Sequence, residues 1–300
     1  MADMTTRADR ERLVEEADQG DHLCLAFADD AEQRRVATAY VLGGLERGER
    51  VMYFADGRAP EQVLGWLREA GADPAPALER GQLVVTTADD SYLAVGPFDP
   101  DAMVATLHRE VADSLAAGYT GFRVSGEMGW ALRDVPGADR LGEYETKVNE
   151  VFAGGPASAI CQYDARRFDA DALAAFDGRH PGAVAPEPLY SSGLLRLAPS
   201  FRAGRRALRV VGDVDYQSAA ALAAALETAM GWPGDITVDM SGLDFIDLAG
   251  VRALVQTAER LPEGRRMHIV ELTPMLRHVM HVVGWDRIPA LTVNAGEGAE

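Results

Sequence analysis

Hydrophobic and polar residues in the first half of the chain follow two alternating spacings. Short apolar runs flanked by turn residues are typical of buried strands, whereas longer stretches with an apolar residue every three or four positions predict amphipathic helices. The spacings predict strands at 22–27, 49–55, 81–88, 121–132 and 158–165, and helices at 31–48, 60–71, 100–118 and 138–152. A charged leader before the first strand is expected to be helical. Strands alternating with such helices favour βαβ units and a mostly parallel sheet with helices on both faces.

The second part of the chain has a different order of elements, because two strands come first and three helices then alternate with further strands. The pattern predicts strands at 194–198, 207–215, 235–247, 266–272 and 290–293, and helices at 217–231, 248–261 and 273–285. Between the two parts, residues 178–193 are rich in proline and glycine without periodicity, which is typical of a linker. We therefore predict an α/β first domain at 1–177, a linker at 178–193 and a second domain at 194–300.

The charge distribution supports this division. The chain has 300 residues and a net charge of −18. Residues 196–300 carry 11 basic and 13 acidic side chains, whereas the preceding residues carry 18 and 34. Two parts that differ so much in charge are expected to be separate domains. Because a strongly anionic chain repels phosphates, we expect no direct binding to nucleic acid.

Several other classes of protein are excluded by the sequence. No run of about 18 apolar residues is long enough for a membrane span, and the charged N-terminus does not resemble a secretory signal. Two distant cysteines, Cys24 and Cys161, do not form a disulfide framework, so we predict a cytoplasmic protein. Lys147 is the only lysine, and no glycine run precedes it, which excludes a phosphate-binding P-loop. The loop at 28–33, after the first predicted strand, has no glycine and three acidic residues, so it would repel phosphate.

The second domain resembles the STAS domain of anti-sigma-factor antagonists and sulphate transporters. The resemblance rests on GDVD (212–215), VDMSGLDFIDLAG (238–250) and MLRHVMHVVGW (275–285). It implies a small STAS-type mixed sheet with helices on one face, and an anti-sigma factor or a histidine-kinase-like regulator as the partner. The residues expected to bind this partner are Asp213, Asp247, Leu248, Ala249 and Gly250.

The position after Asp247 determines how such a domain is switched. Asp247 precedes the helix predicted at 248–261, where its carboxylate is placed to accept a backbone N–H as an N-cap. In switched antagonists, a serine directly after this aspartate is phosphorylated, and the added charge breaks partner binding. This chain has Leu248 there, so it lacks that phosphorylation site. Leu248 is then either an apolar contact in a permanent interface or a helix-start residue that only packs.

The first domain resembles the MEDS domain, a sensory module named from methanogen and methylotroph regulators. The resemblance rests on GDHLCLAFADDAEQ (20–33), GERVMYFA (48–55), RVSGEMGWAL (123–132), the pair YE (144–145) and CQYDARRF (161–168). It implies a RecA-like core that has lost its nucleotide chemistry, uses no cofactor and senses small, often apolar molecules.

Open parallel sheets bind ligands at the carboxyl ends of their strands. On this basis we predict a small-molecule site made of His22, Cys24, Phe27, Glu127, Trp130, Glu145, Cys161 and Tyr163. Strand alternation places His22 and Cys24 on one face of their strand, and Cys161 and Tyr163 on one face of theirs. Buried histidines and cysteines usually serve the core, so we predict no metal, although adjoining strands would allow His22, Cys24 and Cys161 to hold a soft metal ion.

Two carboxylates leave alternatives open. Glu127 lies beside Gly126 and Gly129, and is either a hydrogen-bond hub or a ligand contact. Glu145 lies at the edge of an apolar helix face, and is either a ligand contact or an ion-pair partner of Arg123 or Arg133.

These features together predict a cytoplasmic signalling regulator rather than an enzyme, in which the first domain controls partner binding by the second. One alternative is an enzyme that uses Glu127 as a general base near Cys24 or His22. The other is an interaction scaffold without a ligand. The sequence leaves open whether the chain forms a homodimer, and no membrane association is expected.

Overall fold

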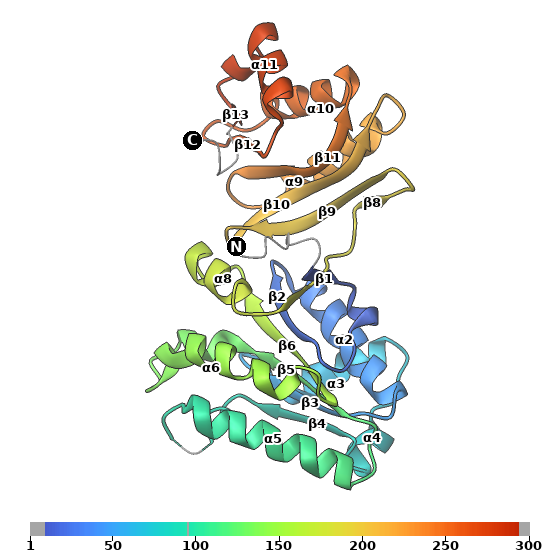
Figure 1. Cartoon of the computed structure of the whole chain (residues 1–300), viewed down its shortest axis with the longest axis vertical. Helices are drawn as coiled ribbons and strands as arrows, with labels where there is room; N and C mark the ends of the chain where they lie inside the picture. Colours follow the sequence, from blue (N-terminus) through green and yellow to red (C-terminus); the bar gives the residue numbers. More distant parts are fainter. Residues whose placement is uncertain (1–9, 95, 294–300) are drawn as a thin grey trace. The chain divides into compact units, whose positions relative to one another are not determined.

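The computed structural model describes residues 10–94 and 96–293 (Figure 1). The chain divides into two compact units between Ala185 and Pro186, inside the range 178–193 that was predicted as a linker.

A seven-stranded sheet forms the centre of the first unit. Its strands are β1 (Glu11–Arg12), β2 (His22–Phe27), β3 (Arg50–Ala55), β4 (Leu83–Thr87), β5 (Phe122–Glu127), β6 (Ala157–Asp164) and β7 (Gly182–Val184), and they lie in the order β1-β7-β2-β6-β5-β3-β4. All neighbouring strands are parallel. The second and third strands are therefore separated by two others, and residues about 140 positions apart in sequence meet where β2 pairs with β6.

Helices cover both faces of this sheet. They are α2 (Asp30–Glu46), α3 (Pro60–Glu69), α4 (Ala75–Glu79), α5 (Pro100–Ala116), α6 (Leu141–Lys147), α7 (Asn149–Phe152) and α8 (Ala170–Asp177). Apolar residues of α2, α3 and α4 pack on one face, and those of α5 to α8 pack on the other. The predicted α/β class with a mostly parallel sheet between helices is confirmed (Figure 1).

Some predicted elements of the first unit differ from the structure. The strand predicted at 121–132 ends at Glu127 and continues as a 3-10 helix (Met128–Leu132). The helix predicted at 138–152 is divided into a 3-10 turn (Ala138–Arg140), α6 and α7. Its second half breaks at Val148, next to Asn149, whose side chain is held by His22 and the Arg179 carbonyl. Tertiary hydrogen bonds therefore override the helical periodicity there.

Two further differences concern the ends of the unit. The leader was predicted to be helical, but its described part forms β1 and a 3-10 turn (Val14–Glu16). The prediction for residues 1–9 lies outside the described residues. The range 178–193 contains β7, which pairs with β1 and β2, and β8 (Tyr190–Ser191), which belongs to the second unit. Strands of two or three residues are too short to leave a periodic signal.

The second unit contains a mixed six-stranded sheet. Its strands are β8, β9 (Leu195–Arg202), β10 (Arg205–Val214), β11 (Ile236–Ile246), β12 (Met267–Val270) and β13 (Leu291–Val293), in the order β13-β12-β11-β10-β9-β8. The β8, β9 and β10 strands pair antiparallel, whereas β10 to β13 pair parallel. This arrangement confirms the predicted mixed sheet.

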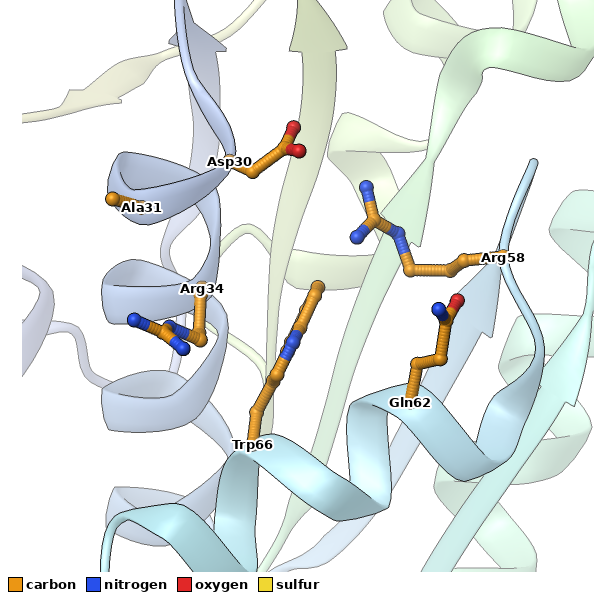
Figure 2. Close-up of a pocket in the computed structure, with 6 residues that line it drawn as sticks. All are labelled: Asp30, Ala31, Arg34, Arg58, Gln62 and Trp66. Carbon is orange, nitrogen blue, oxygen red and sulfur yellow. The ribbon is translucent and has the colours of Figure 1, made fainter.

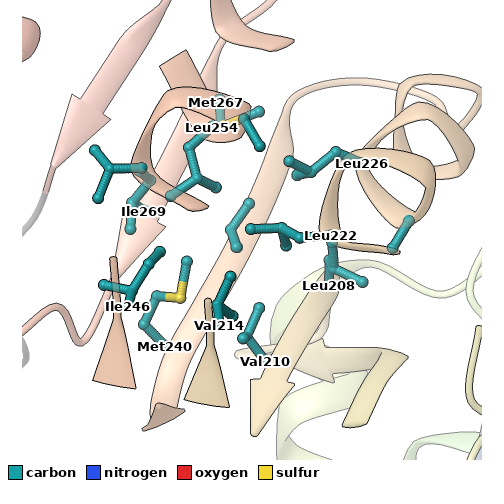
Figure 3. Packing of buried hydrophobic residues seen from close by; sticks show 14 of the residues in the cluster. Leu208, Val210, Val214, Leu222, Leu226, Met240, Ile246, Leu254, Met267 and Ile269 are labelled. Atoms are coloured by element: carbon teal, nitrogen blue, oxygen red, sulfur yellow. The ribbon is translucent and has the colours of Figure 1, made fainter. Parts of the chain in front are cut away.

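Three helices complete the second unit: α9 (Ala219–Met230), α10 (Leu248–Glu259) and α11 (Pro274–Val283), followed by a 3-10 turn (Trp285–Arg287). They share one core with the sheet. Figure 3 shows Leu222 and Leu226 of α9 and Leu254 of α10 converging on strand side chains such as Val210 and Val214.

Gly250 permits the close approach of α10 to the sheet. A Cβ at this position would lie 2.6 Å from Val214 Cγ1 and 2.7 Å from Ile246 Cγ1, which is closer than carbon atoms can pack. Gly65 in α3 is a useful contrast, because nothing lies within 4 Å of the place its Cβ would occupy.

We expect the two glycines to respond oppositely to alanine. Gly250→Ala overpacks the core and should lower the free energy of unfolding of the second unit by about 1–3 kcal/mol. Gly65→Ala creates no clash and reduces the conformational freedom of the unfolded chain. It should therefore raise the free energy of unfolding of the first unit by about 0.5–1 kcal/mol. Urea unfolding followed by circular dichroism measures both values. Equal effects of the two substitutions would contradict the packing described for Gly250.

Candidate functional site

The carboxyl end of β5 carries a buried carboxylate with several hydrogen-bond partners. Glu127 Oε1 accepts from the Tyr53 hydroxyl at 2.8 Å and lies 3.0 Å from Arg58 Nε, while Oε2 accepts from the backbone N–H of Asp56 at 2.9 Å. Burial raises the pKa of Glu127, and the nearby Arg58 guanidinium opposes this rise. Of the two interpretations left open by the sequence, the structure supports the hydrogen-bond hub, and ligand contact by Glu127 stays a proposal.

A hollow of about 350 Å³ opens beside this hub, between the start of α2 and the β3–α3 connection (Figure 2). Its lining residues are Asp30, Ala31, Arg34, Arg58, Gln62 and Trp66. The Arg58 guanidinium lies 4.8 Å from the centroid of the Trp66 ring, a cation–π contact. None of the eight predicted ligand residues lines the hollow. Apart from Arg58 in the β3–α3 connection, these residues come from the first two turns of α2 and α3, whose surface positions give no distinct signal in a single sequence.

A second polar group lies inside the unit, on the face of β2 and β6 that α6 and α8 cover. His22 Nε2 is 3.4 Å from Cys161 Sγ and 3.4 Å from Glu145 Oε2, and His180 Nε2 is 3.2 Å from the same carboxylate oxygen. The Tyr163 hydroxyl donates to Glu145 Oε1 at 2.6 Å. These five side chains are buried. The predicted sharing of strand faces is therefore confirmed, and because Cys24 pairs in register with Cys161, the strands do adjoin.

Electrostatics within this group follow from burial and from mutual contact. Burial by itself raises the pKa of Glu145, but the two histidines outweigh it and leave the pKa well below its ordinary value. Burial lowers the pKa of His22 and raises that of the Cys161 thiol. Sequence reasoning missed His180 because it lies within the predicted linker.

Of the two alternatives left open for Glu145, the ion pair with Arg123 or Arg133 is not formed. Arg123 points to the opposite face of the sheet, where it forms a buried ion pair of 2.6 Å with Glu49. Arg133 lies near Asp56 and Asp89. A sequence pattern places residues on a helix or strand, but it does not determine which distant charge they meet.

The alternative of Glu127 as a general base near Cys24 or His22 also conflicts with the geometry. Glu127 is bonded on the α2 and α3 face of the sheet, whereas His22 and Cys24 point to the face covered by α6 and α8. Side chains on opposite faces of a sheet do not share a proton. The other two predicted ligand residues also lie apart: Phe27 packs under α2, and Trp130 packs between Tyr92 and Phe98.

Trp130 is fully buried and cannot contact a ligand without rearrangement of the core. Its indole lies 5.2 Å from the Tyr92 ring and 4.6 Å from the Phe98 ring, measured between centroids. The prediction that Trp130 binds a ligand is therefore wrong for the structure described here, because its ring fills the space under α5 and α6.

In the second unit, the predicted turn at the start of α10 is formed as expected. Asp247 caps the helix, and its Oδ1 accepts from the backbone N–H groups of Ala249 at 2.7 Å and Gly250 at 3.0 Å. Leu248 is 52% exposed and so does not merely pack. Gly250, however, is buried against Val214 and Ile246. The expectation that Gly250 contacts a partner is therefore wrong, because the lack of a side chain at this position allows α10 to pack on the sheet.

Comparison with known proteins identifies both units. Residues 21–181, more than half of the chain, match the family described as the methanogen/methylotroph, DcmR sensory domain, MEDS, and the chain belongs to this family. Residues 198–292 match the STAS domain family described as Mlab, STAS domain. The chain therefore carries a MEDS domain followed by a STAS domain, as the sequence resemblances predicted.

One curated relative is the anti-sigma-F factor antagonist RsfB of Mycobacterium tuberculosis, found in two strains. It is 27% identical over 85 residues, which cover 28% of this chain and 70% of the relative. With the STAS match, this relative supports a role in regulatory signalling. Among the residues that the structure describes, no helix is long and apolar enough to cross a membrane.

Two solved structures are similar to parts of this chain. A crystal structure of an anti-sigma factor antagonist from Mycobacterium paratuberculosis covers 36% of this chain and 89% of its own, with 23% identity and a TM-score of 0.30. A KaiC-like protein from the archaeon Pyrococcus horikoshii covers 63% of this chain and 89% of its own, with 11% identity and a TM-score of 0.42.

Replacing the buried indole tests the placement of Trp130. Trp130→Ala removes a large core side chain and should lower the free energy of unfolding of the first unit by about 3–5 kcal/mol. Trp66→Ala, at a partly exposed ring that lines the hollow, should cost clearly less. Urea unfolding monitored by circular dichroism compares the two variants. A fully stable Trp130→Ala protein would instead place this indole at an open surface.

Proposed function

We propose that this chain is a cytoplasmic signalling regulator whose STAS unit binds an anti-sigma factor, or a related histidine-kinase-like regulator, under the control of the MEDS unit. The observation that carries the proposal is the exposed apolar side chain of Leu248 at the start of α10. RsfB is named as an anti-sigma-F factor antagonist, and the match to it lends support to this class of partner.

The contact surface is proposed at the carboxyl ends of β10 and β11. Val214 pairs with Ile246 in register at the carboxyl ends of the two strands. Tyr216 and Leu248, each two residues further along the chain, therefore follow the strands at the same end of the sheet. Tyr216 is 73% exposed, and Phe245 beside them is 52% exposed. Single exposed apolar residues are common on proteins, but three at the carboxyl ends of two neighbouring strands are typical of an interaction site.

Acidic groups surround this apolar edge and define the complementary partner. Asp213 pairs in register with Phe245. Asp244, the residue before Phe245, is exposed. The expected partner surface therefore holds an apolar pocket with basic side chains at its rim, since opposite charges steer association and fix orientation. Ala249 and the Asp247 cap position the turn within this surface.

The absence of a hydroxyl at position 248 favours an interface that stays competent for binding. Phosphorylation would place a charge of about −2 at this point, and leucine cannot accept it. Control would then come from the first unit. A small ligand there changes partner binding only if it binds two arrangements of the chain with different affinity. The hollow lined by Arg58 and Trp66 is the proposed ligand site. Its guanidinium groups, Arg34 paired with Glu69 and Arg58 with Glu127, and the Asp30 carboxylate favour a polar molecule over a purely apolar one.

A charge placed on the turn tests the proposed interface. Leu248→Asp should weaken binding of the purified anti-sigma partner by about tenfold or more, because an unpaired buried polar group costs about 1–3 kcal/mol and each 1.4 kcal/mol is a factor of ten. Leu248→Asn removes the apolar contact without adding charge and should cause a smaller loss. Isothermal titration calorimetry measures the affinities.

Leu115→Asp provides the control, because Leu115 is also exposed, at 43%, but lies on α5 of the first unit. It should bind the partner as tightly as the wild type. If Leu248→Asp also binds with unchanged affinity while the second unit stays folded, the interface lies elsewhere and the proposal fails.

A further inference from the structure

Four side chains of the first unit direct metal-ligating atoms at one point. They are His22 on β2, Glu145 on α6, Cys161 on β6 and His180 between α8 and β7, and their ligand atoms all lie within 4.8 Å of one another. All four residues are buried. They come from four different elements, so their convergence is a product of the fold and not of a local turn.

Hydrogen bonds on the outer side of the two imidazoles determine which ring nitrogens face this point. His22 Nδ1 lies 2.7 Å from Asn149 Oδ1. The Asn149 orientation is fixed because its Nδ2 donates to the Arg179 carbonyl at 3.0 Å. His180 Nδ1 lies 2.8 Å from the Phe176 carbonyl oxygen. Both Nδ1 atoms therefore carry the proton and donate it outward, and in the neutral rings both Nε2 atoms present lone pairs inward.

In this tautomeric state neither neutral imidazole donates a hydrogen bond toward the centre of the group, so the Cys161 thiol is the one remaining donor among the four side chains. Glu145 Oε2 faces His180 Nε2 at 3.2 Å and His22 Nε2 at 3.4 Å. With both rings neutral, all three atoms are acceptors. The other oxygen, Oε1, is already satisfied by the Tyr163 hydroxyl. Two imidazole lone pairs facing a buried carboxylate oxygen are strongly unfavourable unless a cation, either a metal ion or a proton on a ring, lies between them.

We propose that His22, Glu145, Cys161 and His180 bind one zinc ion as a closed structural site. A tetrahedral zinc ion with bonds of about 2.0–2.3 Å separates its ligand atoms by about 3.3–3.8 Å. Three of the six separations between ligand atoms, at 3.2 to 3.4 Å, are close to this spacing, and all six are within 4.8 Å, so binding requires the ligands to move together slightly. Two imidazoles, one thiolate and one carboxylate are a zinc donor set.

The surrounding hydrogen bonds are also those of a metal site. Ligating histidines almost always donate their second ring N–H to a carbonyl or carboxylate, and ligating carboxylates are themselves hydrogen-bonded. The Asn149 amide, the Phe176 carbonyl and the Tyr163 hydroxyl fill these three roles. The sequence predicted no metal because the strands alone supply only His22 and the cysteines. The proposal differs because the fold adds Glu145 and His180 as two further ligands.

Cys24 offers a matched control. It pairs in register with Cys161 on the neighbouring strand and is equally buried, yet it is outside the group of four. A serine at either position removes one sulfur atom from the same core at nearly the same depth. Only the substitution at Cys161 removes a proposed ligand.

The experiment uses the full-length protein expressed with zinc in the medium. Plasma mass spectrometry should find about one zinc per chain in the wild type and in Cys24→Ser, and clearly less in Cys161→Ser. After replacement of zinc by cobalt(II), the wild type and Cys24→Ser should show thiolate-to-cobalt charge-transfer absorption, and Cys161→Ser should lack it. Removal of the metal with a chelator should lower the Tm, and added zinc should restore it.

Two results would overturn the proposal. The first is a wild-type protein that carries no first-row metal and whose Tm responds neither to chelator nor to added zinc, which would mean that protons alone hold the group together. The second is a Cys24→Ser protein that loses metal and the cobalt absorption as completely as Cys161→Ser does. If Cys161→Ser fails to fold, the metal content and cobalt spectrum of the wild type still decide the question.

Discussion

Parallel pairing between strands that are distant in the chain is the constraint on which both units depend. In the first unit, pairing of β2 with β6 places Cys24 beside Cys161 and directs His22 toward the same face. In the second, pairing of β10 with β11 places Asp213 beside Phe245 and brings Leu248 to the same sheet edge as Tyr216. Parallel strands end together, so the residues that follow them meet without being neighbours in sequence.

The two units use this constraint for different purposes. The sheet of the first unit is covered on both faces, so each polar side chain it carries must find a partner inside the protein. Arg123 pairs with Glu49, and Glu127 and Glu145 each accept a hydrogen bond from a tyrosine hydroxyl, of Tyr53 and Tyr163 respectively. The second unit leaves large apolar residues exposed at its strand ends, which is the expected property of a surface that contacts another protein.

Most of the longer helices and strands were predictable from the sequence, because the spacing of apolar residues indicates them. The strand at His22–Phe27 and the helix beginning at Pro60 match their predictions closely, and the Asp247 cap was predicted from residue type and position. The short strands β1, β7 and β8 were missed, because two or three residues cannot show a period.

The polar contacts were less predictable, for a physical reason. Strand alternation correctly paired His22 with Cys24 on one face, but it did not determine which distant side chains cover that face. For Glu145 the sequence left open a ligand contact or an ion pair with an arginine, and the residue instead contacts His180, which follows α8 in a segment without periodicity. Trp130 was expected at a pocket, yet neighbouring glycines give no information on whether a ring points inward.

The central claim is that the chain acts by contact through the edge formed by β10, β11 and the start of α10. Hydrogen–deuterium exchange of the full chain, measured with and without its purified anti-sigma partner, tests it most directly. Slower exchange in the partner's presence is expected at residues 213–217 and 243–252, with the interior of the first unit unchanged. Unaltered exchange at both segments, together with protection at another surface, would contradict the claim.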